Sequence, residues 1–368
     1  MNIAYDEQIF GVQTYGGISR YFCEIATRIS RLPETQVTIV APLPVCAYLQ
    51  NVPSEIVLGF NLSRMKRFRV ARRALGMLIG NLMLHASAPD LIHETYFASY
   101  RLGPKKAKRV MTIHDMVYEK FASSFPNTDK TATHKKKTAE RADHIICVSE
   151  STRCDAIEIL GLPPEKITVV HHGFTLMTDW TNVIDESTPS GNEPYILYVG
   201  QRGGYKNFQR LLEAFASSSV LNTNFKLICF GGGAFHVNEK DAMSKLGLKS
   251  ERVIQLEGGD DILAVLYRRA SVFVYPSLYE GFGIPPLEAM AHGCPVICSN
   301  TSSIPEVVGD AGEYFDPWQV ASIRDAVERV VSSELLKSEL RRKGSARLSL
   351  FSWDRCAVET YDVYKKLI

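Results

Sequence analysis

The chain has 368 residues, of which 45% are hydrophobic and 22% are charged, and its formal net charge is only +2. This composition excludes a disordered, collagen-like or coiled-coil protein, and a general nucleic-acid binder would usually be more basic. The length is sufficient for two ordinary domains.

Short apolar, β-branched runs alternate with longer helical patterns along the whole chain, as is typical of buried parallel strands in βαβ units. We predict strands at 2–5, 36–41, 90–93, 109–114, 144–149 and 167–171, and then at 195–199, 225–230, 252–256, 271–275 and 295–298. Because the pattern occurs twice, the sequence predicts two doubly wound, Rossmann-like α/β domains that face each other across a central cleft.

A polar segment without periodicity separates the two halves. Residues 179–194 contain Ser, Gly, Asn and Pro, and we interpret them as a linker between an N-terminal domain, 1–178, and a C-terminal domain, 195–352. Apolar residues recur at helical spacing over 353–368, which predicts a closing amphipathic helix that packs back on the N-terminal domain.

Nothing in the sequence indicates secretion or a membrane span. The first ten residues lack a basic region followed by an apolar stretch, and no apolar run reaches the roughly 18 residues that a span needs. The eight cysteines form no Cys-x2-Cys pair, which favours reduced core residues. We therefore expect a cytoplasmic protein.

The most informative segment runs from Tyr275 to Ser299 and reads YPSLYEGFGIPPLEAMAHGCPVICS. It predicts a strand, a glycine-containing loop with Glu280, and a helix that is opened by two prolines and carries Glu288 in its first turn. The backbone of the loop, at Gly281, Phe282, Gly283 and Ile284, can direct N–H groups at an anion or at sugar oxygens. Two carboxylates beside such donors suit a ligand with hydroxyls and phosphates. A simpler interpretation makes Glu280 a surface residue and Glu288 a partner of the helix dipole.

This segment, with Glu280 and Glu288 eight residues apart, resembles the signature of the family 4 retaining glycosyltransferases, which have the two-domain GT-B fold. The resemblance extends to residues 142–157, 167–173, 198–215 and 351–367, and it is weakest over 42–88. It implies that Glu288 binds the ribose hydroxyls of a nucleotide sugar and that Glu280 contacts hydroxyls of the donor hexose. The bacterial surface-polysaccharide mannosyltransferases are the most similar members.

A second loop, Gln201-Arg202-Gly203-Gly204-Tyr205-Lys206-Asn207, lies between a predicted strand and a predicted helix, where a phosphate is expected. Arginine and lysine together can neutralise a leaving diphosphate. In the family, an arginine and a lysine of this loop hold the diphosphate, which implies that role for Arg202 and Lys206. The arginine stands one residue later here than in the commoner family pattern, and two solvated loop cations are the alternative.

Two strand ends in the first half complete the predicted site. Gly16 and Gly17 let the backbone approach a ligand closely, and the family places this loop near the donor phosphate and the acceptor. His114 and Asp115 end the strand RVMTIHD. Family members carry a histidine here that touches the transferred sugar, and Asp115 would orient it or approach the acceptor. A capped structural histidine is the alternative.

A basic tract over residues 64–73 holds six cations and continues into the apolar run ALGMLIGNLMLH. Positive charge beside an amphipathic helix fits an anionic membrane or a lipid diphosphate, whereas a solvated helix face is the alternative. We therefore expect peripheral contact at the inner face of the cytoplasmic membrane.

The resemblance implies a retaining hexosyltransferase with no cofactor besides its donor. We expect mannose transfer from GDP-mannose to a saccharide acceptor, lipid-linked, in lipopolysaccharide or other surface polysaccharide biosynthesis. A UDP-glucose enzyme is the second candidate, and a nucleotide-sugar epimerase of similar architecture or a degenerate sugar-nucleotide binding module are less favoured. No residue cluster has metal-ligand spacing, which predicts metal-independent catalysis. No carboxylate is placed as a covalent nucleophile, which favours front-face transfer. No nucleic acid is expected as a partner.

Overall fold

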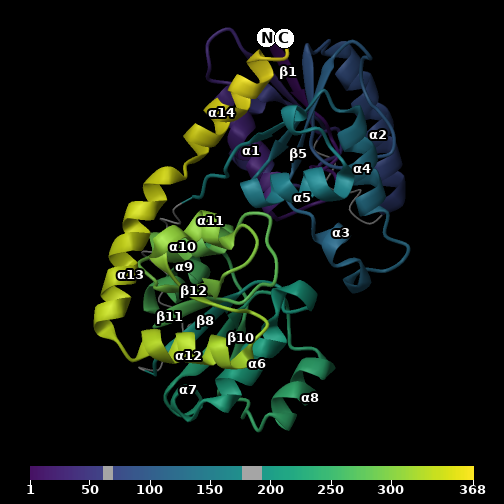
Figure 1. Ribbon diagram of the computed structural model, residues 1–368. Coiled ribbons are helices and arrows are strands. Elements are labelled where there is room, and N and C mark those ends of the chain that lie inside the picture. Colours follow the sequence, from purple (N-terminus) through teal and green to yellow (C-terminus); the bar gives the residue numbers. More distant parts are fainter. Residues whose placement is uncertain (61–68, 176–192) are drawn as a thin grey trace. The chain divides into compact units, whose positions relative to one another are not determined.

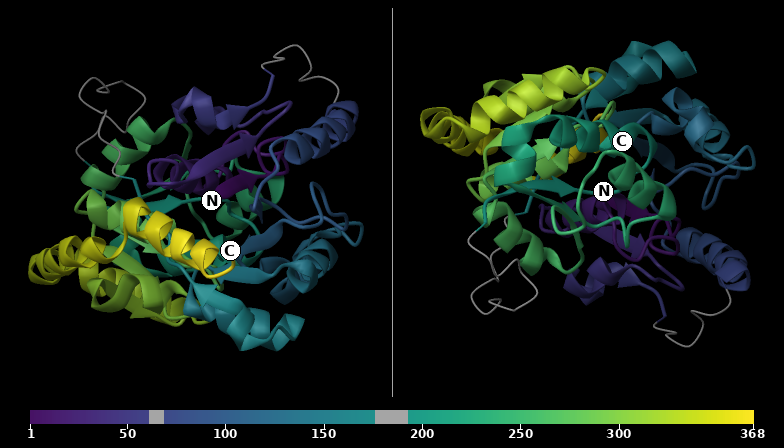
Figure 2. Two further views of the ribbon diagram at one scale, coloured as in Figure 1. Left: turned by 90° about the horizontal axis from the view of Figure 1, so that it is seen from above. Right: turned by 90° about the horizontal axis from the view of Figure 1, so that it is seen from below.

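The computed structural model describes residues 1–60, 69–175 and 193–368, and it divides into two compact units. Unit 1 comprises residues 1–173 and 352–368, and unit 2 comprises residues 174–351. The C-terminal segment thus returns to unit 1, and both chain ends lie close together there (Figures 1 and 2). Most of the predicted linker, residues 179–192, lies outside the described residues.

Unit 1 is built on a seven-stranded sheet with the order β3-β2-β1-β4-β5-β6-β7, in which every neighbouring pair is parallel. Its strands are β1 (Asn2–Tyr5), β2 (Gln36–Val40), β3 (Val57–Leu58), β4 (Leu91–Glu94), β5 (Lys108–Ile113), β6 (His144–Cys147) and β7 (Ile167–Val169). Its helices are α1 (Gly17–Ile29), α2 (Arg69–Ala86), α3 (Val117–Lys120), α4 (Thr131–Arg141), α5 (Glu150–Leu160) and α14 (Trp353–Lys365).

Strand periodicity divides the core of unit 1 between the two faces of the sheet. Ile3 and Tyr5 of β1 pack in one apolar cluster with residues of α1 and α14, whereas Ala4 packs in another with Leu84 of α2. Successive strand residues point to opposite faces, so the three buried residues of β1, Ile3 to Tyr5, must all be apolar or aromatic for the strand to be covered on both sides. The two helices α1 and α14 lie against each other (Figure 1).

Unit 2 holds a six-stranded parallel sheet with the order β10-β9-β8-β11-β12-β13. Its strands are β8 (Tyr195–Val199), β9 (Lys226–Phe230), β10 (Val253–Leu256), β11 (Val272–Tyr275), β12 (Val296–Ser299) and β13 (Gly312–Phe315). Its helices are α6 (Phe208–Ser217), α7 (Ser219–Asn224), α8 (Val237–Lys245), α9 (Asp260–Arg269), α10 (Ile284–Ala291), α11 (Ile304–Val308), α12 (Val320–Val331) and α13 (Glu334–Arg347). In the apolar core of unit 2, the two central strands β8 and β11 pack against α6 and α12.

All eleven predicted strands are present, and the doubly wound α/β class is confirmed. The sequence did not predict β3 and β13, which form one edge of each sheet. β3 has only two residues, and three of the four residues of β13 are partly exposed, so neither carries the continuous apolar run of a buried strand. Among the described residues, no helix combines the length and the apolar character needed to cross a membrane.

Each sheet has one point at which its strand order reverses. In unit 1 this point lies between β1 and β4, and in unit 2 it lies between β8 and β11. Loops at the carboxyl ends of the two flanking strands diverge there to opposite faces, which opens a crevice where ligands of such sheets bind. Both units therefore offer a binding position, and their side chains decide its chemistry.

Candidate active site

The reversal point of unit 2 brings together the two loops that the sequence singled out. One follows β8 and ends in a short 3-10 helix, Gly204–Lys206, and the other follows β11. Lys206 Nζ lies 2.7 Å from Glu280 Oε1, and the amide of Leu278 donates to the carbonyl of Tyr205 at 2.7 Å. An ammonium and a carboxylate thus stand side by side at the carboxyl end of the sheet.

The Lys206–Glu280 pair is largely shielded from solvent, with side-chain exposures of 18% and 11%. The ammonium also lies 5.1 Å from the ring centre of Tyr205 and 5.8 Å from that of Tyr275. Aromatic faces attract a cation, and low exposure strengthens every charge interaction at this position. The pair is therefore well suited to act on a charged or hydroxylated ligand.

A run of hydroxyl side chains after β12 holds the Glu280 loop in place. Ser302 Oγ accepts from the amide of Glu280 at 2.9 Å. Ser303 Oγ donates to the carbonyls of Glu280 and Phe282, both at 2.8 Å, and Thr301 Oγ1 donates to that of Leu278 at 3.1 Å. The sequence pattern did not single out these residues. Their signal was a Thr-Ser-Ser run that is separated by two residues from the end of the predicted strand 295–298.

The loop reaches α10 through a backbone turn at Gly283, whose φ of 110° lies in the region that favours glycine. Gly281 precedes it, and the buried Phe282 ring packs against Phe351 at 5.7 Å, so this side chain is structural. The helix begins at Ile284 without a side-chain cap. Ligand binding by the backbone of this loop stays a prediction.

Glu288 lies in the second turn of α10 and not in the first, because the helix already begins at Ile284. Its Oε2 accepts from the hydroxyl of Tyr267 on α9 at 3.5 Å. The Tyr267 side chain is fully buried and stacks on His292 with ring centres 6.0 Å apart. A rigid neighbour therefore restricts the Glu288 carboxylate, and its predicted role at a ribose stays a prediction.

Arg202 differs from the sequence-based expectation, because its guanidinium points at the glycine loop after β9. It donates to Glu239 Oε1 at 2.7 Å and to the carbonyls of Gly231 and Gly233, also at 2.7 Å. Only 7% of the residue is exposed. These bonds hold three successive glycines at positive φ, and Lys206 is the cation placed beside Glu280. The structure gives no support to the diphosphate role predicted for Arg202.

In unit 1, His114 follows β5 and lies parallel to His172, with ring centres 5.4 Å apart and an interplanar angle of 6°. The two rings are 3.4 Å apart between His114 Nδ1 and His172 Nε2, and Tyr21 meets both edge-on. Burial, reinforced by His172, holds the pKa of His114 well below its usual range. His114 is therefore neutral at physiological pH.

The Nε2 atom of His114 is buried and has no hydrogen-bond partner among the described residues. A neutral imidazole can donate or accept one hydrogen bond there. No local pattern could indicate that His172 lies against His114, because the two are 58 residues apart.

Asp115 is tied to its own neighbourhood. Its Oδ1 accepts from the amide of Val117 at 3.1 Å, and buried Lys135 donates to its carbonyl at 2.8 Å. Lys135 also pairs with Glu119 at 2.8 Å. The partner of the His114 ring is His172 rather than Asp115, so the predicted orienting role of Asp115 has no support in these contacts.

The glycine pair before α1 has two different environments. A Cβ at Gly16 would come within 2.2 Å of the side chain of Gln13, whose Oε1 accepts from the amide of Ser19 at 2.9 Å. A Cβ at Gly17 would meet no atom within 4 Å. A side chain at Gly16 would therefore displace the Gln13 amide, whereas Gly17 faces open space that a ligand can enter.

No group of three or more His, Cys, Asp or Glu within residues 1–60, 69–175 and 193–368 is arranged to hold a metal ion. The positive charge beside Glu280 comes from Lys206. Metal-independent catalysis stays a prediction.

Similarity to known proteins identifies the family of the chain. Residues 15–176 match the family described as Glycosyltransferase Family 4, and residues 181–347 match Glycosyl transferases group 1. The chain is 31% identical to the O-antigen chain mannosyltransferase B of Escherichia coli over 288 residues, which are 73% of each chain. The protein belongs to glycosyltransferase family 4. The family resemblance seen in the sequence is thereby confirmed, and the chain is a glycosyltransferase.

Another relative of this family 4 glycosyltransferase is the serotype-specific mannosyltransferase WbdA of Escherichia coli. The two are 26% identical over a region that covers 84% of the present chain but only 40% of WbdA. Among solved structures, WaaG, a glycosyltransferase involved in lipopolysaccharide biosynthesis, superposes with a TM-score of 0.71 at 18% identity over 99% of both chains. Anabaena Alr3699/HepE in complex with UDP-glucose gives 0.74 at 17% identity, again over 99% of both chains. These similarities confirm the GT-B fold.

Proposed function

We propose that this enzyme transfers mannose from GDP-mannose to a saccharide acceptor in the synthesis of a surface polysaccharide. The main support is the Lys206–Glu280 pair at the reversal point of unit 2. It places a cation and a carboxylate, which can accept hydrogen bonds from sugar hydroxyls, at the position where such sheets bind ligands. The choice of mannose rests on relatives that are named O-antigen mannosyltransferases.

In the proposed reaction, the bond between the hexose C1 and the diphosphate oxygen breaks, and its electron pair leaves with the diphosphate. Lys206 balances the charge that develops there, which is the largest electrostatic demand of such a step. The acceptor hydroxyl oxygen forms a bond to C1 on the same face, and its proton passes to the departing phosphate oxygen. The anomeric configuration is thereby retained without a covalent enzyme intermediate.

The carboxylate and the imidazole would position the hexose. Glu280 accepts hydrogen bonds from its hydroxyls, and charge-assisted bonds of this kind are about twice as strong as neutral ones. His114, which burial keeps neutral, offers its unpartnered Nε2 to a further sugar oxygen. Glu288, held beside Tyr267, would bind the ribose of the nucleotide.

UDP-glucose is the second candidate donor, since one structural neighbour, Anabaena Alr3699/HepE, is known in complex with that molecule. Separate incubations with GDP-mannose and UDP-glucose, followed by quantification of the released nucleotide diphosphate, decide between them. We expect release from GDP-mannose; faster release from UDP-glucose would reverse the donor assignment, and release from neither would remove both.

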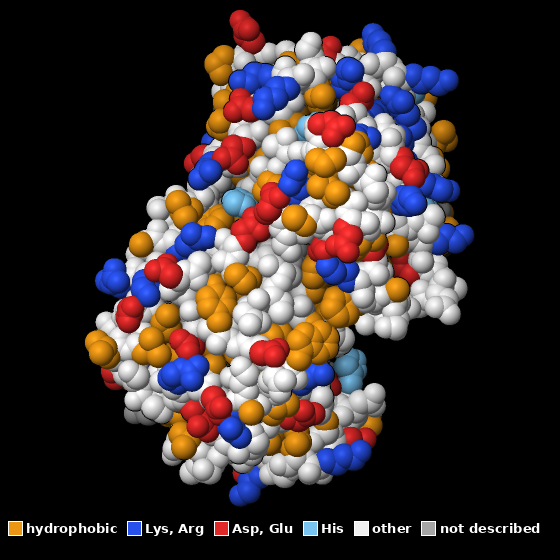
Figure 3. All heavy atoms as spheres, viewed as in Figure 1, with side chains coloured by type: hydrophobic (Ala, Val, Ile, Leu, Met, Phe, Trp, Pro, Cys, Tyr) orange, Lys and Arg blue, Asp and Glu red, His pale blue; other side chains and the backbone are white. Residues whose placement is uncertain are grey.

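Peripheral membrane contact is part of the proposal. The predicted basic tract lies partly outside the described residues, but α2 exposes apolar side chains at helical spacing, among them Leu75, Leu78 and Leu82. In Figure 3, hydrophobic and basic side chains alternate along the edge where α2 lies. An apolar stripe with adjacent cations suits an anionic lipid surface. Arg72 is an exception, because it is buried and turned away from this stripe.

A further inference from the structure

His114 and His172 meet although they follow different strands of the unit 1 sheet, β5 and β7. His114 Nδ1 and His172 Nε2 lie 3.4 Å apart and share one hydrogen bond. The ring planes differ by only 6°, which lets the N–H of one ring point at the lone pair of the other. This contact leaves Nε2 of His114 as the ring atom that can meet a ligand.

Both rings are neutral at physiological pH, because burial removes the solvation that an imidazolium needs. Burial is the main cause that holds the pKa of His114 well below its usual range, and His172 adds to it. Burial and the neighbouring His171 lower the pKa of His172 to about 3. Each ring therefore carries one hydrogen and one lone pair on its two nitrogens.

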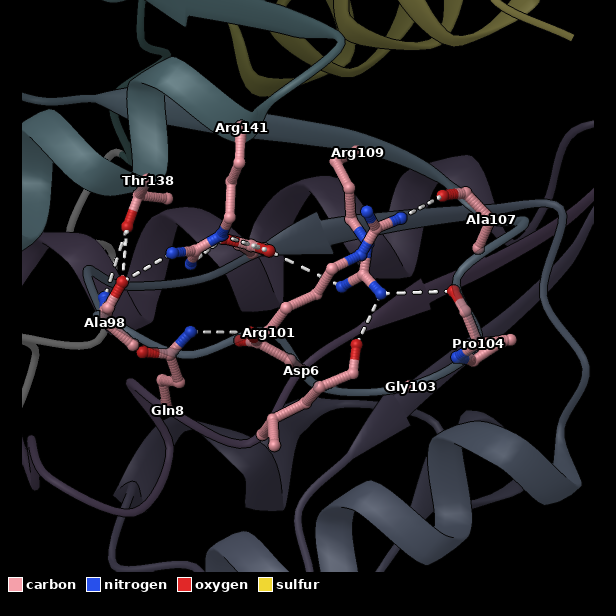
Figure 4. A network of polar contacts seen from close by, with 12 residues as sticks. Asp6, Gln8, Ala98, Arg101, Gly103, Pro104, Ala107, Arg109, Thr138 and Arg141 are labelled. Atoms are coloured by element: carbon pink, nitrogen blue, oxygen red, sulfur yellow. Dashed lines mark hydrogen bonds and ion pairs between the residues drawn. The ribbon is translucent and has the colours of Figure 1, made fainter.

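The buried charged groups at the ends of β4 and β5 form a network of their own (Figure 4). Glu94 pairs with Arg141 at 2.6 Å, and Arg109 lies 3.4 Å from the same carboxylate. Two guanidinium groups thus balance the charge of Glu94, and this carboxylate is not among the groups that shift the pKa of His114. The network therefore does not favour an imidazolium at His114.

Aromatic packing fixes both rings in place. Tyr21 of α1 meets His114 and His172 edge-on, with ring centres 5.0 and 4.8 Å apart. Trp353 at the start of α14 lies 5.9 Å from the His172 ring. A Cβ at Gly173 would clash with the backbone of Trp353, so the segment that carries His172 is held closely against α14. This packing restricts the His172 ring.

The shared bond couples the tautomers of the two rings, and two arrangements satisfy it. In the first, His172 Nε2–H donates to the lone pair of His114 Nδ1, and the hydrogen of His114 is on Nε2. In the second, His114 Nδ1–H donates to His172 Nε2, and both rings carry their hydrogen on Nδ1. A neutral histidine side chain by itself is more stable with its hydrogen on Nε2. Only the first arrangement gives both rings this form.

We propose that His172 is a positioning residue that holds the His114 ring in one orientation and in the Nε2–H form, so that His114 donates a hydrogen bond to an oxygen of the transferred hexose. The inference rests on the proposed function, in which His114 contacts the hexose. It adds the direction of that bond. Without the hydrogen bond from His172, the His114 ring can rotate or carry its hydrogen on either nitrogen, and a donor faces the sugar only part of the time.

The first test is long-range proton–nitrogen correlation NMR of the full chain without ligand, labelled with ¹⁵N in histidine only. The pattern distinguishes a protonated from an unprotonated ring nitrogen, and comparison with His114→Asn assigns the His114 signals. We expect hydrogen on Nε2 of His114 in the wild type. His172→Met has no hydrogen-bond donor and should give both tautomers, whereas the amide of His172→Gln can donate to Nδ1 and should restore the single Nε2–H form.

Hydrogen on Nδ1 of His114 in the wild type would overturn the proposal. So would a His114 pattern in His172→Met that is identical to that of the wild type. The wild-type spectrum needs no variant, so it decides on the tautomer even if His172→Met fails to fold.

The second test measures the release of nucleotide diphosphate from GDP-mannose and from UDP-glucose. His172→Met should lower kcat by about fivefold, as expected for one lost hydrogen bond, and His172→Gln should recover most of the loss. In the His114→Asn background, His172→Met should have no further effect, because it acts through His114. His85→Gln changes an exposed histidine of the same unit and should leave kcat unchanged.

An equal loss from His172→Met in both backgrounds would show a merely structural role and would overturn the proposal. Failure of the proposed function would look different: the wild type would release neither GDP nor UDP. The NMR spectra would then still decide whether His172 positions His114.

Discussion

Replacing Glu7 by glutamine should stabilise the unliganded protein, and the gain should grow with pH. Burial and the charge of Asp6 raise the pKa of Glu7 to about 8, from 4.5 in the unfolded chain. Between these two pH values the Glu7 carboxyl is ionised in the unfolded chain but keeps its proton in the folded protein. The free energy of unfolding therefore falls as pH rises. Glutamine has a similar shape and never ionises.

The magnitude follows from the same two pKa values. At pH 7 the unfolded pKa lies 2.5 units below the pH, which corresponds to about 3 kcal/mol of lost stability, whereas at pH 5 the loss is below about 1 kcal/mol. For a unit of this size, Glu7→Gln should therefore raise the melting temperature by about 5–10 °C at pH 7 and by about 2–3 °C at pH 5.

Differential scanning calorimetry of the full chain at both pH values measures this effect, and hydrogen exchange of β1 identifies the transition of unit 1. The exposed Glu165→Gln variant is the control and should shift neither transition. A Glu7→Gln gain that is equal at pH 5 and pH 7, or a loss of stability at pH 7, would show that Glu7 does not stay protonated in the folded protein.

The remaining predictions concern both units. Lys206→Met should lower turnover by about 100-fold or more with little change in melting temperature, and Glu280→Gln by about tenfold or more; steady-state rates near wild type for both would disprove their roles. Arg202→Ala should destabilise unit 2 by about 3–5 kcal/mol, because Glu239 and the four carbonyls of residues 231–234 lose their donor, and an unchanged calorimetric transition would show that these bonds are dispensable. Turnover should survive excess EDTA, and a loss that Mn²⁺ restores would contradict metal independence. Leu78→Ser with Leu82→Ser should reduce sedimentation with anionic vesicles at low salt, and cosedimentation equal to wild type would exclude α2 as the contact.

The sequence predicted the architecture well, because buried parallel strands need continuous apolar runs and such runs are local. It also located both loops of the unit 2 site, since each joins a strand to a helix. Neither the ion pair of Lys206 with Glu280 nor the support by Ser302 and Ser303 could be predicted from spacing, because the partners are 74 and about 22 residues apart.

Other side-chain contacts were equally beyond the reach of a local pattern. Arg202 is a cation in a phosphate-type loop, and in the structure its partners are Glu239 and carbonyls about 30 residues away. Its role at a diphosphate stays a prediction. Arg72 lies in a basic tract that predicts a solvated or lipid-facing surface, yet the packing of α2 buries it beside Glu7. Charge type is local in sequence, whereas the direction of a side chain is set by the assembled fold.

The most direct test of the account is the stereochemistry of donor cleavage. The enzyme is incubated with α-configured GDP-mannose, and proton NMR follows the anomeric signal of the first sugar product together with released GDP, for the wild type and Lys206→Met. We predict equal amounts of GDP and an α-configured product from the wild type, and cleavage slowed about 100-fold or more in the variant. A β-configured first product, or equally fast cleavage by Lys206→Met, would contradict a retaining transfer supported by the Lys206–Glu280 pair.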